Sequence, residues 1–194
     1  MFLVAKGDVE IEIKIPVSKV SFGKVRRYLK KNAVLMGKSR DTDKYYNLPI
    51  RSFLKTKHPI EYLRIRAGSG GSFINYKYNY LNSKGKKTHA DEYESRVENA
   101  IQLEKILSAL SYKNFMTVDK HRESYQTRSG FEVDLDEVSG LGYFVEVEAK
   151  KDFGNRGKTY EEVVKLVKML GLNPDDQDQN GYVLLLMKKK GLVG

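Results

Sequence analysis

The 194-residue sequence contains no cysteine and only three histidines. The absence of cysteine excludes disulfide frameworks, thiolate zinc sites and cysteine nucleophiles. The three histidines, His58, His89 and His121, are too scattered along the chain to indicate a histidine-based metal site. Any metal ion would therefore be held by carboxylates, which favours hard ions such as Mg²⁺ or Mn²⁺.

Long hydrophobic runs are also missing. No apolar stretch approaches the roughly 20 residues that a membrane span needs, and Met1–Val9 lacks the basic start and apolar stretch of a signal peptide. We therefore expect a cytoplasmic protein without a membrane partner. The length and the 40% hydrophobic content predict a single domain over residues 1–194.

Positive charge is in excess, with a formal net charge of +10. Such an excess is compatible with polyanionic partners, including nucleotides and nucleic acid. The surplus gathers in three runs: Lys24, Arg26, Arg27, Lys30 and Lys31; Lys84, Lys86 and Lys87; and Lys188, Lys189 and Lys190. Each run has two interpretations, a solvated surface or a nucleic-acid patch, and the pattern favours the solvated surface. A nucleic-acid partner is not expected.

Hydrophobic periodicity predicts three short helices among many strands. The helices are Lys19–Lys31, Ala100–Leu110 and Tyr160–Leu170, with Ser18, Asn99 and Thr159 as their N-terminal caps. The strands are Val9–Ile15, Asp43–Leu48, Tyr62–Ala67, Ser72–Leu81, His89–Val97, Asp119–Gln126, Gly130–Glu137, Gly142–Ala149 and Tyr182–Lys188. Asn82-Ser83-Lys84-Gly85 indicates a hairpin, and Asn173–Asn180 a loop. So many antiparallel strands in one domain predict an α+β fold in which a closed β-barrel carries the helices outside.

Charged residues recur at every second position of these strands, so that they share one face. The sets are Glu10, Glu12 and Lys14; Arg64 and Arg66; Lys120 and Arg122; Glu132, Asp134 and Asp136; and Glu146 and Glu148, with Lys77 alone in its strand. A solvated sheet face shows the same alternation. Apart from Lys14 in the first set, each set carries one sign of charge, which favours a barrel interior where carboxylates hold divalent metal and cations bind phosphates.

The sequence resembles the CYTH superfamily, also called triphosphate tunnel metalloenzymes. Glu10-Ile11-Glu12-Ile13-Lys14 matches the ExExK signature of that superfamily, and further similar segments follow in the expected order. They are Asp43-Lys44-Tyr45-Tyr46, Leu63-Arg64-Ile65-Arg66, Tyr76-Lys77, Asp91-Glu92-Tyr93-Glu94, Lys120-His121-Arg122 with Tyr125, and the long stretch Asp136–Glu148. The stretch Asp136–Glu148 looks most like the branch of class IV adenylyl cyclases and thiamine triphosphatase-like proteins. One departure is Tyr78-Asn79, where many relatives have Gly-Pro.

The resemblance implies a role for each matching residue. The metal ligands would be Glu10, Glu12, Asp136, Glu146 and Glu148, for Mg²⁺ or Mn²⁺ in a pair of ions. The substrate ligands would be Lys14, Arg64, Arg66, Lys77, Lys120 and Arg122. Lys14 and Asp136 are expected to take part in catalysis, Glu92, Glu94 and Asp134 have no assigned role, and a homodimer is compatible with the family.

The implied function is a metal-dependent enzyme acting on a triphosphate. The first candidate is an adenylyl cyclase that converts ATP to cyclic AMP and pyrophosphate. A triphosphatase that hydrolyses inorganic, thiamine or nucleoside triphosphate fits the same residues, because both reactions need positioning and charge neutralisation. A module that binds RNA or polyphosphate without catalysis is the third, less favoured interpretation.

Overall fold

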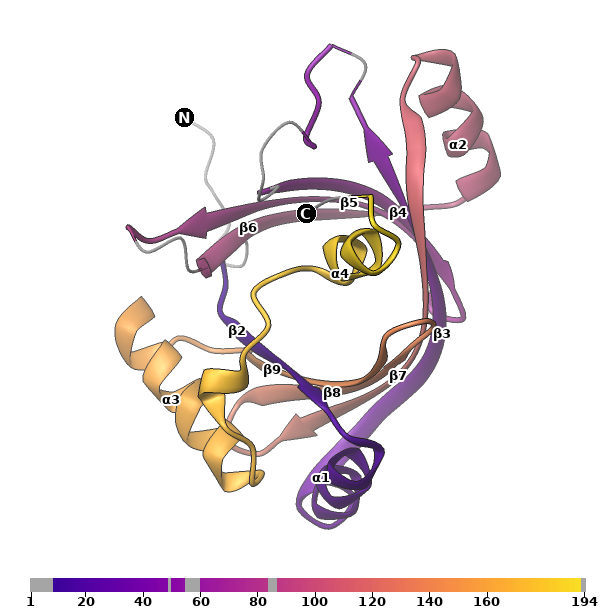
Figure 1. Cartoon of the computed structure of the whole chain (residues 1–194). Coiled ribbons are helices and arrows are strands. Elements are labelled where there is room, and N and C mark those ends of the chain that lie inside the picture. The colour runs from indigo at the N-terminus through magenta and orange to yellow at the C-terminus, as the bar shows by residue number, and fades with distance from the viewer. Residues whose placement is uncertain (1–8, 49, 55–59, 84–86, 193–194) are drawn as a thin grey trace. The chain divides into compact units, whose positions relative to one another are not determined.

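The computed structural model describes residues 9–48, 50–54, 60–83 and 87–192 (Figure 1). His58, Lys84 and Lys86 lie outside the described residues. In the described part of the chain the strands are β1(Val9–Glu10), β2(Glu12–Val17), β3(Ala33–Asn47), β4(Glu61–Gly68), β5(Gly71–Leu81), β6(Lys87–Val97), β7(Lys113–Thr127), β8(Phe131–Val138) and β9(Gly142–Ala149). The helices are α1(Lys19–Asn32), α2(Ala100–Ala109), α3(Arg156–Met169), the short 3-10 helix η1(Pro174–Asp176) and α4(Tyr182–Lys189).

The strands form an antiparallel sheet in the order β1-β6-β5-β4-β3-β7-β8-β9-β2. The predicted α+β class and the antiparallel pairing are thereby confirmed. Over the described residues, the strand order ends at β1 on one side and β2 on the other. Closure of the sheet into a barrel is therefore not confirmed.

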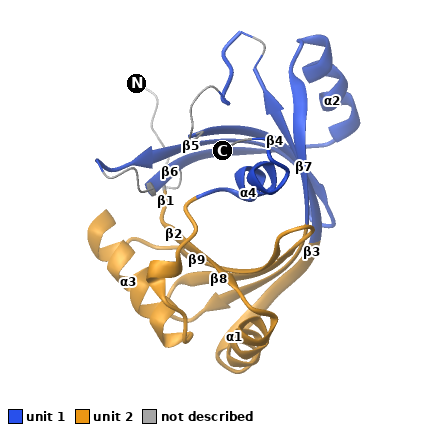
Figure 2. Cartoon of the chain, viewed as in Figure 1, with its two compact units in different colours: residues 1–9, 40–119, 180–194 blue, residues 10–39, 120–179 orange. Residues whose placement is uncertain are grey.

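The chain divides into two compact units, each built from separate segments (Figure 2). Unit 1 comprises residues 1–9, 40–119 and 180–194, and unit 2 comprises residues 10–39 and 120–179. The two long strands β3 and β7 each run from one unit into the other. Both are longer than the predicted Asp43–Leu48 and Asp119–Gln126, because their added halves lack the apolar-polar alternation by which a strand is recognised.

The core of unit 2 lies between the sheet and the helices α1 and α3. Ile11, Ile13 and Ile15 alternate with the charged residues of the N-terminal segment and are at most 7% exposed. They are joined in this core by Val145 and Val147 of β9. Because successive side chains of a strand point to opposite faces, the intervening charged residues lie on the other face of the sheet.

The core of unit 1 includes a contact between its sheet and α2. Tyr46 of β3, Ile65 of β4 and Leu107 of α2 form a buried cluster, against which Leu63 and Leu103 pack. Here too, alternate positions of β3 and β4 carry charged residues to the opposite face. Each unit thus presents one apolar face to a helix and one face rich in charge.

Two of the three predicted helix caps are confirmed. The Ser18 and Asn99 side chains accept hydrogen bonds from the backbone N–H of Ser21 and Gln102, at the starts of α1 and α2. The prediction for α3 is wrong at its start, since Asn155 is the cap and Thr159 is a buried residue inside the helix. Glycines at positions 154 and 157 are typical of loops and so obscure the first turn in the sequence.

The prediction of a strand at Tyr182–Lys188 is also wrong, because this segment forms helix α4. Its side chains are buried in a nearly continuous run, so no period of two or of 3.6 residues is visible. Leu and Met are good helix formers, and Val183 is the single β-branched residue of the segment. None of the helices among the described residues is both long and apolar enough to traverse a membrane.

Candidate functional site

Strand register in unit 2 aligns charged residues of β2, β9 and β8 across the sheet. Glu12 lies opposite Glu148, and Glu148 lies opposite Glu132 on its other side. A second row of aligned residues in these three strands contains one cation, Lys14. The two rows are Glu12–Glu148–Glu132 and Lys14–Glu146–Asp134. The register therefore brings residues separated by more than a hundred positions onto one face of one sheet.

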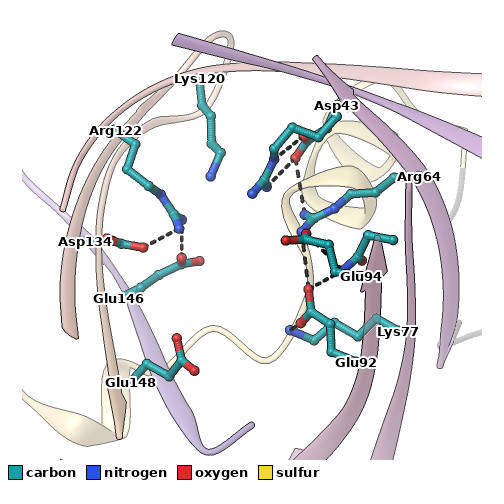
Figure 3. Close-up of polar contacts among 12 residues, drawn as sticks. Asp43, Arg64, Lys77, Glu92, Glu94, Lys120, Arg122, Asp134, Glu146 and Glu148 are labelled. Atoms are coloured by element: carbon teal, nitrogen blue, oxygen red, sulfur yellow. Dashed lines mark hydrogen bonds and ion pairs between the residues drawn. The ribbon is translucent and has the colours of Figure 1, made fainter. Parts of the chain in front are cut away.

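Arg122 of β7 contacts three carboxylates, and Figure 3 shows its ion pairs with two of them, Asp134 and Glu146. Its Nε donates to Asp136 Oδ1 at 2.7 Å, and one terminal nitrogen donates to Asp136 Oδ2 at 2.5 Å. The guanidinium also forms ion pairs with Asp134 and Glu146. Lys120 Nζ lies 3.7 Å from Asp136 Oδ2, and both side chains are almost completely buried. Two predicted metal ligands, Asp136 and Glu146, are thus occupied by a predicted phosphate ligand.

Burial and the neighbouring charges shift the pKa values of Arg122 and Asp134. Burial alone would lower the pKa of Arg122, but Asp136, Asp134 and Glu146 hold it well above its ordinary value. Burial raises the pKa of Asp134 to about 6, against the lowering effect of Arg122 and with a further increase from Glu146. Three carboxylates thus surround one guanidinium, and Lys120 contacts one of them, Asp136.

A lysine that directly follows β9 contacts two of the three carboxylates in the Glu12–Glu148–Glu132 row. Lys150 Nζ lies 2.6 Å from Glu148 Oε2 and 3.6 Å from Glu132 Oε1. Burial raises the pKa of Glu148 to about 7; Lys150 opposes this shift, while Glu12 and Glu132 add to it. Like charges directly opposite one another in a sheet are destabilising, so this row is favourable only with a cation beside it.

In unit 1, Asp43 of β3 holds two arginines of β4. Arg66 donates to both oxygens of Asp43, at 2.7 and 2.9 Å, and Arg64 donates to Oδ2 at 3.2 Å. The Asp43 side chain is 1% exposed. Figure 3 shows Asp43 and Arg64 projecting from the strands of this unit. A buried carboxylate with two guanidinium partners is a strong, fixed arrangement of charge-assisted hydrogen bonds.

Glu92 of β6 forms the second centre of unit 1. Its carboxylate is contacted by Lys77 Nζ at 3.0 Å and by Arg64 at 3.4 Å, and it accepts a hydrogen bond from Asn75 Nδ2 at 2.5 Å. Asn75 Nδ2 also lies 3.4 Å from Glu94. Burial would raise the pKa of Glu92, but Lys77 and Arg64 lower it to about 2. Glu92 is therefore ionised at neutral pH.

We expect Glu92 to stabilise the protein in a pH-dependent manner. Because its pKa falls from 4.5 to about 2 on folding, the stabilisation is complete above pH 4.5 and is lost as the pH falls towards 2. Urea unfolding of wild type and Glu92→Gln should show a difference in unfolding free energy that is larger at pH 7 than at pH 3. The control, Glu98→Gln, changes an exposed residue just after β6. A difference for Glu92→Gln that is equal at the two pH values would contradict the expectation.

The structure distributes the predicted site residues between the units. Unit 1 contains Arg64, Arg66 and Lys77, and unit 2 contains Glu10, Glu12, Lys14, Lys120, Arg122, Asp136, Glu146 and Glu148. Asp134 and Glu92, which had no assigned role, are ion-pair partners of these residues. Sequence reasoning missed Lys150 altogether. The available signal was its spacing of two residues from Glu148, but the predicted strand ended at Ala149.

The residues of unit 2 suit a divalent metal ion by their chemistry. Within the described residues, no three Asp, Glu or His side chains are already arranged around a metal position. Arg122 lies among the carboxylates instead, and Asp134 Oδ1 is buried without a hydrogen-bond partner. The donors are all carboxylate oxygens, which hard ions such as Mg²⁺ prefer. The Glu12–Glu148–Glu132 row has three carboxylates and one contacting lysine, Lys150, and a bound divalent ion would reduce this excess of negative charge.

Three comparisons relate the chain to known proteins. The sequence profile described as "CYTH domain" matches residues 8–182. The Methanocaldococcus jannaschii protein named "Putative adenylate cyclase MJ0240" is 31% identical over 179 residues, which are 91% of this chain and 98% of that protein. The PH1819 protein of Pyrococcus horikoshii OT3 has the same fold, with a TM-score of 0.77, 31% identity and coverage of 93% of this chain and 99% of that chain.

A plant structure shares the fold at lower identity. It is the Hippeastrum protein named "Putative adenylyl cyclase HpAC1", which is described as having a dominant triphosphatase activity. Its TM-score is 0.64 at 15% identity, with coverage of 94% of this chain and 95% of that chain. The profile match and the 31% identity to the archaeal protein over nearly the full length of both establish the relationship. The chain is a member of the CYTH domain family.

Proposed function

We propose that this protein is a divalent-metal-dependent enzyme that acts on a triphosphate, and that it converts ATP to cyclic AMP and pyrophosphate. One observation carries the proposal: the cations expected to bind phosphate are held in place by carboxylates on largely buried sheet faces. Asp136 and Glu146 hold Arg122, and Asp43 and Glu92 hold Arg64. Such a set of fixed cations is suited to polyphosphate oxygens.

The metal ions would be held by Glu10, Glu12, Asp136, Glu146 and Glu148. Bound Mg²⁺ or Mn²⁺ would supply neutralisation of the phosphate charge. When Asp136 and Glu146 serve a metal ion, Arg122 loses two of its three carboxylate partners and becomes available to phosphate. The same residues thus link metal binding to phosphate binding, and each should increase the affinity of the protein for the other.

Buried donors in unit 1 would meet the phosphate chain directly. Arg64 Nε is buried and has no hydrogen-bond partner, which costs free energy unless a ligand atom accepts a hydrogen bond from its N–H group. Arg66 and Lys77 are each about one-fifth exposed, at 19%, and both lie beside a carboxylate. In the cyclase reaction the ATP 3′-hydroxyl attacks the α-phosphorus and pyrophosphate leaves, and cations of this kind would stabilise the leaving group.

We further propose that the strands close into the barrel that the sequence predicts. β1 and β2 stand at the two ends of the strand order, and Ile11 alone separates them in the chain. An N-terminal segment whose two halves join β6 and β9 would leave no free edge, and a free edge is a hazard that barrels avoid.

Triphosphate hydrolysis is the second candidate function, with water attacking the terminal phosphorus. The name of the M. jannaschii relative favours a cyclase, whereas the activity reported for the Hippeastrum protein favours hydrolysis. The residues that bind metal and phosphate would be the same in both reactions. The products distinguish the two functions.

We expect metal-dependent turnover of ATP that yields cyclic AMP and pyrophosphate in equal amounts. The measurement is a panel of ATP, tripolyphosphate and thiamine triphosphate with Mg²⁺ or Mn²⁺, analysed for cyclic AMP, pyrophosphate and phosphate. Release of phosphate without cyclic AMP would show that the protein is a triphosphatase and not a cyclase. Unchanged turnover in excess chelator would contradict the metal half of the proposal, and no turnover of any of the three substrates would contradict the whole.

A further inference from the structure

Lys150 is a cation that the catalytic proposal does not use. It directly follows β9, and its backbone N–H donates to the carbonyl oxygen of Gly130 at 3.0 Å, so that its main chain is anchored to the neighbouring strand connection. Its ammonium group contacts Glu148 at 2.6 Å and Glu132 at 3.6 Å. The position two residues after Glu148 places it on the same face as the Glu12–Glu148–Glu132 row.

The surroundings of Lys150 are strongly acidic. Glu148 and Glu132 contact it, and Glu10 also acts on it electrostatically. Glu12 lies directly opposite Glu148 in the sheet register. Three of these four glutamates, Glu10, Glu12 and Glu148, are the ones we propose as metal ligands. The ammonium group therefore lies beside the carboxylates that a metal ion would need.

A divalent ion and the ammonium group of Lys150 would compete for the same carboxylate oxygens. A divalent ion bound to Glu12 and Glu148 would repel the ammonium group of Lys150 at short range. Lys150 is able to leave, because its side chain is 38% exposed and is held by single contacts.

We propose that Lys150 is a tethered counter-ion of the metal site: it partly neutralises the Glu12–Glu148–Glu132 row in the metal-free protein, and a divalent ion displaces it. This inference rests on the proposed function, because it assumes the metal site. Lys150 thereby lowers the affinity of the site for the metal ion. It opposes binding of the ion and at the same time stabilises the empty row.

The test is Mn²⁺ binding by Lys150→Met without substrate, followed by calorimetry or by electron paramagnetic resonance. Removal of the competing ammonium should tighten Mn²⁺ binding about tenfold, the scale of one charge-assisted contact. The melting temperature of the variant should be lower than that of wild type without metal and should recover with Mn²⁺. Lys151→Met is the matched control. It removes the same charge one residue away, where the ammonium lies 4.8 Å from the centre of the Phe153 ring.

Wild-type protein provides a second measurement that does not depend on a variant folding. Acetylation of Lys150 by an amine-reactive reagent, measured by peptide mass spectrometry, should be slow in metal-free protein and faster with saturating Mg²⁺. Lys151 serves as the internal control. Acetylation of Lys150 that is unaffected by Mg²⁺ would overturn the inference.

The outcomes separate the inference from the function on which it rests. If wild type binds Mn²⁺ and Lys150→Met binds it equally or more weakly, Lys150 does not compete with the metal and only this inference fails. Equal tightening by Lys151→Met would show a general charge effect and would also overturn it. If wild type binds no Mn²⁺, the metal site of the proposed function fails together with the inference.

Discussion

Glu146→Gln should reduce metal-dependent turnover of the triphosphate substrate by about two to three orders of magnitude. The substitution preserves side-chain size and removes one negative charge from the carboxylates around Arg122. A surface glutamate would tolerate this change. A metal ligand would not, because the ion loses a carboxylate and Arg122 loses one of its three partners. The measurement is the turnover rate with saturating Mg²⁺ or Mn²⁺, together with Mn²⁺ affinity.

The matched control is Glu137→Gln, which removes the same charge from an exposed position of β8, next to Asp136. Its turnover should equal that of wild type. Glu12→Gln should resemble Glu146→Gln, and the double variant should be little worse than either single variant, because ligands of one metal cluster act as a unit. Losses that multiply in the double variant would indicate independent sites. Wild-type turnover in Glu146→Gln would refute its role as a ligand.

Asp43→Asn should lower the free energy of unfolding by about 3–5 kcal/mol, the range found when one partner of a buried ion pair is removed. Asp43 is 1% exposed and is the shared partner of Arg64 and Arg66, each less than one-fifth exposed. An asparagine leaves two neighbouring guanidinium groups with one carboxylate fewer in a partly desolvated place. Urea unfolding at pH 7 measures the effect.

Asp119→Asn is the control for this variant. Asp119 is exposed, belongs to the same unit and accepts a hydrogen bond from Thr42 Oγ1 at 2.6 Å, and its substitution should cost less than about 1 kcal/mol. Added tripolyphosphate should narrow the difference between wild type and Asp43→Asn, since its oxygens can substitute for the missing carboxylate. A loss in Asp43→Asn no larger than that of the control would show that solvent already compensates the two arginines.

The sequence predicts most of this architecture because period-two alternation is a property of single strands. Val145 and Val147 differ from Glu146 and Glu148 in polarity at every step, so the apolar and the charged face of β9 can be assigned without a structure. The same holds for the N-terminal isoleucines. The helices α1 and α2 can also be predicted from the sequence, because their N-terminal caps, Ser18 and Asn99, form the hydrogen bonds that the pattern indicates.

The partners of each charge could not be predicted, because they depend on the register between strands. Arg122 meets Glu146 only because β7, β8 and β9 are adjacent and aligned, and one strand's pattern contains nothing of that alignment. Lys150 could not be predicted as a site residue from the strand pattern, because it lies just beyond the end of β9. The sequence does not distinguish the C-terminal helix α4 from a strand, because burial on nearly every side removes the periodicity that separates the two structures.

The alternation in β9 also constrains how this chain can vary in length. Inserting one residue within Gly142–Ala149 would rotate all following side chains to the other face. Glu148 would then take the position of Ala149, which packs against the core of unit 2, and Val147 would join the carboxylates. Insertions and deletions should therefore be confined to the connections, such as the turn between β8 and β9, where an extra residue alters no register.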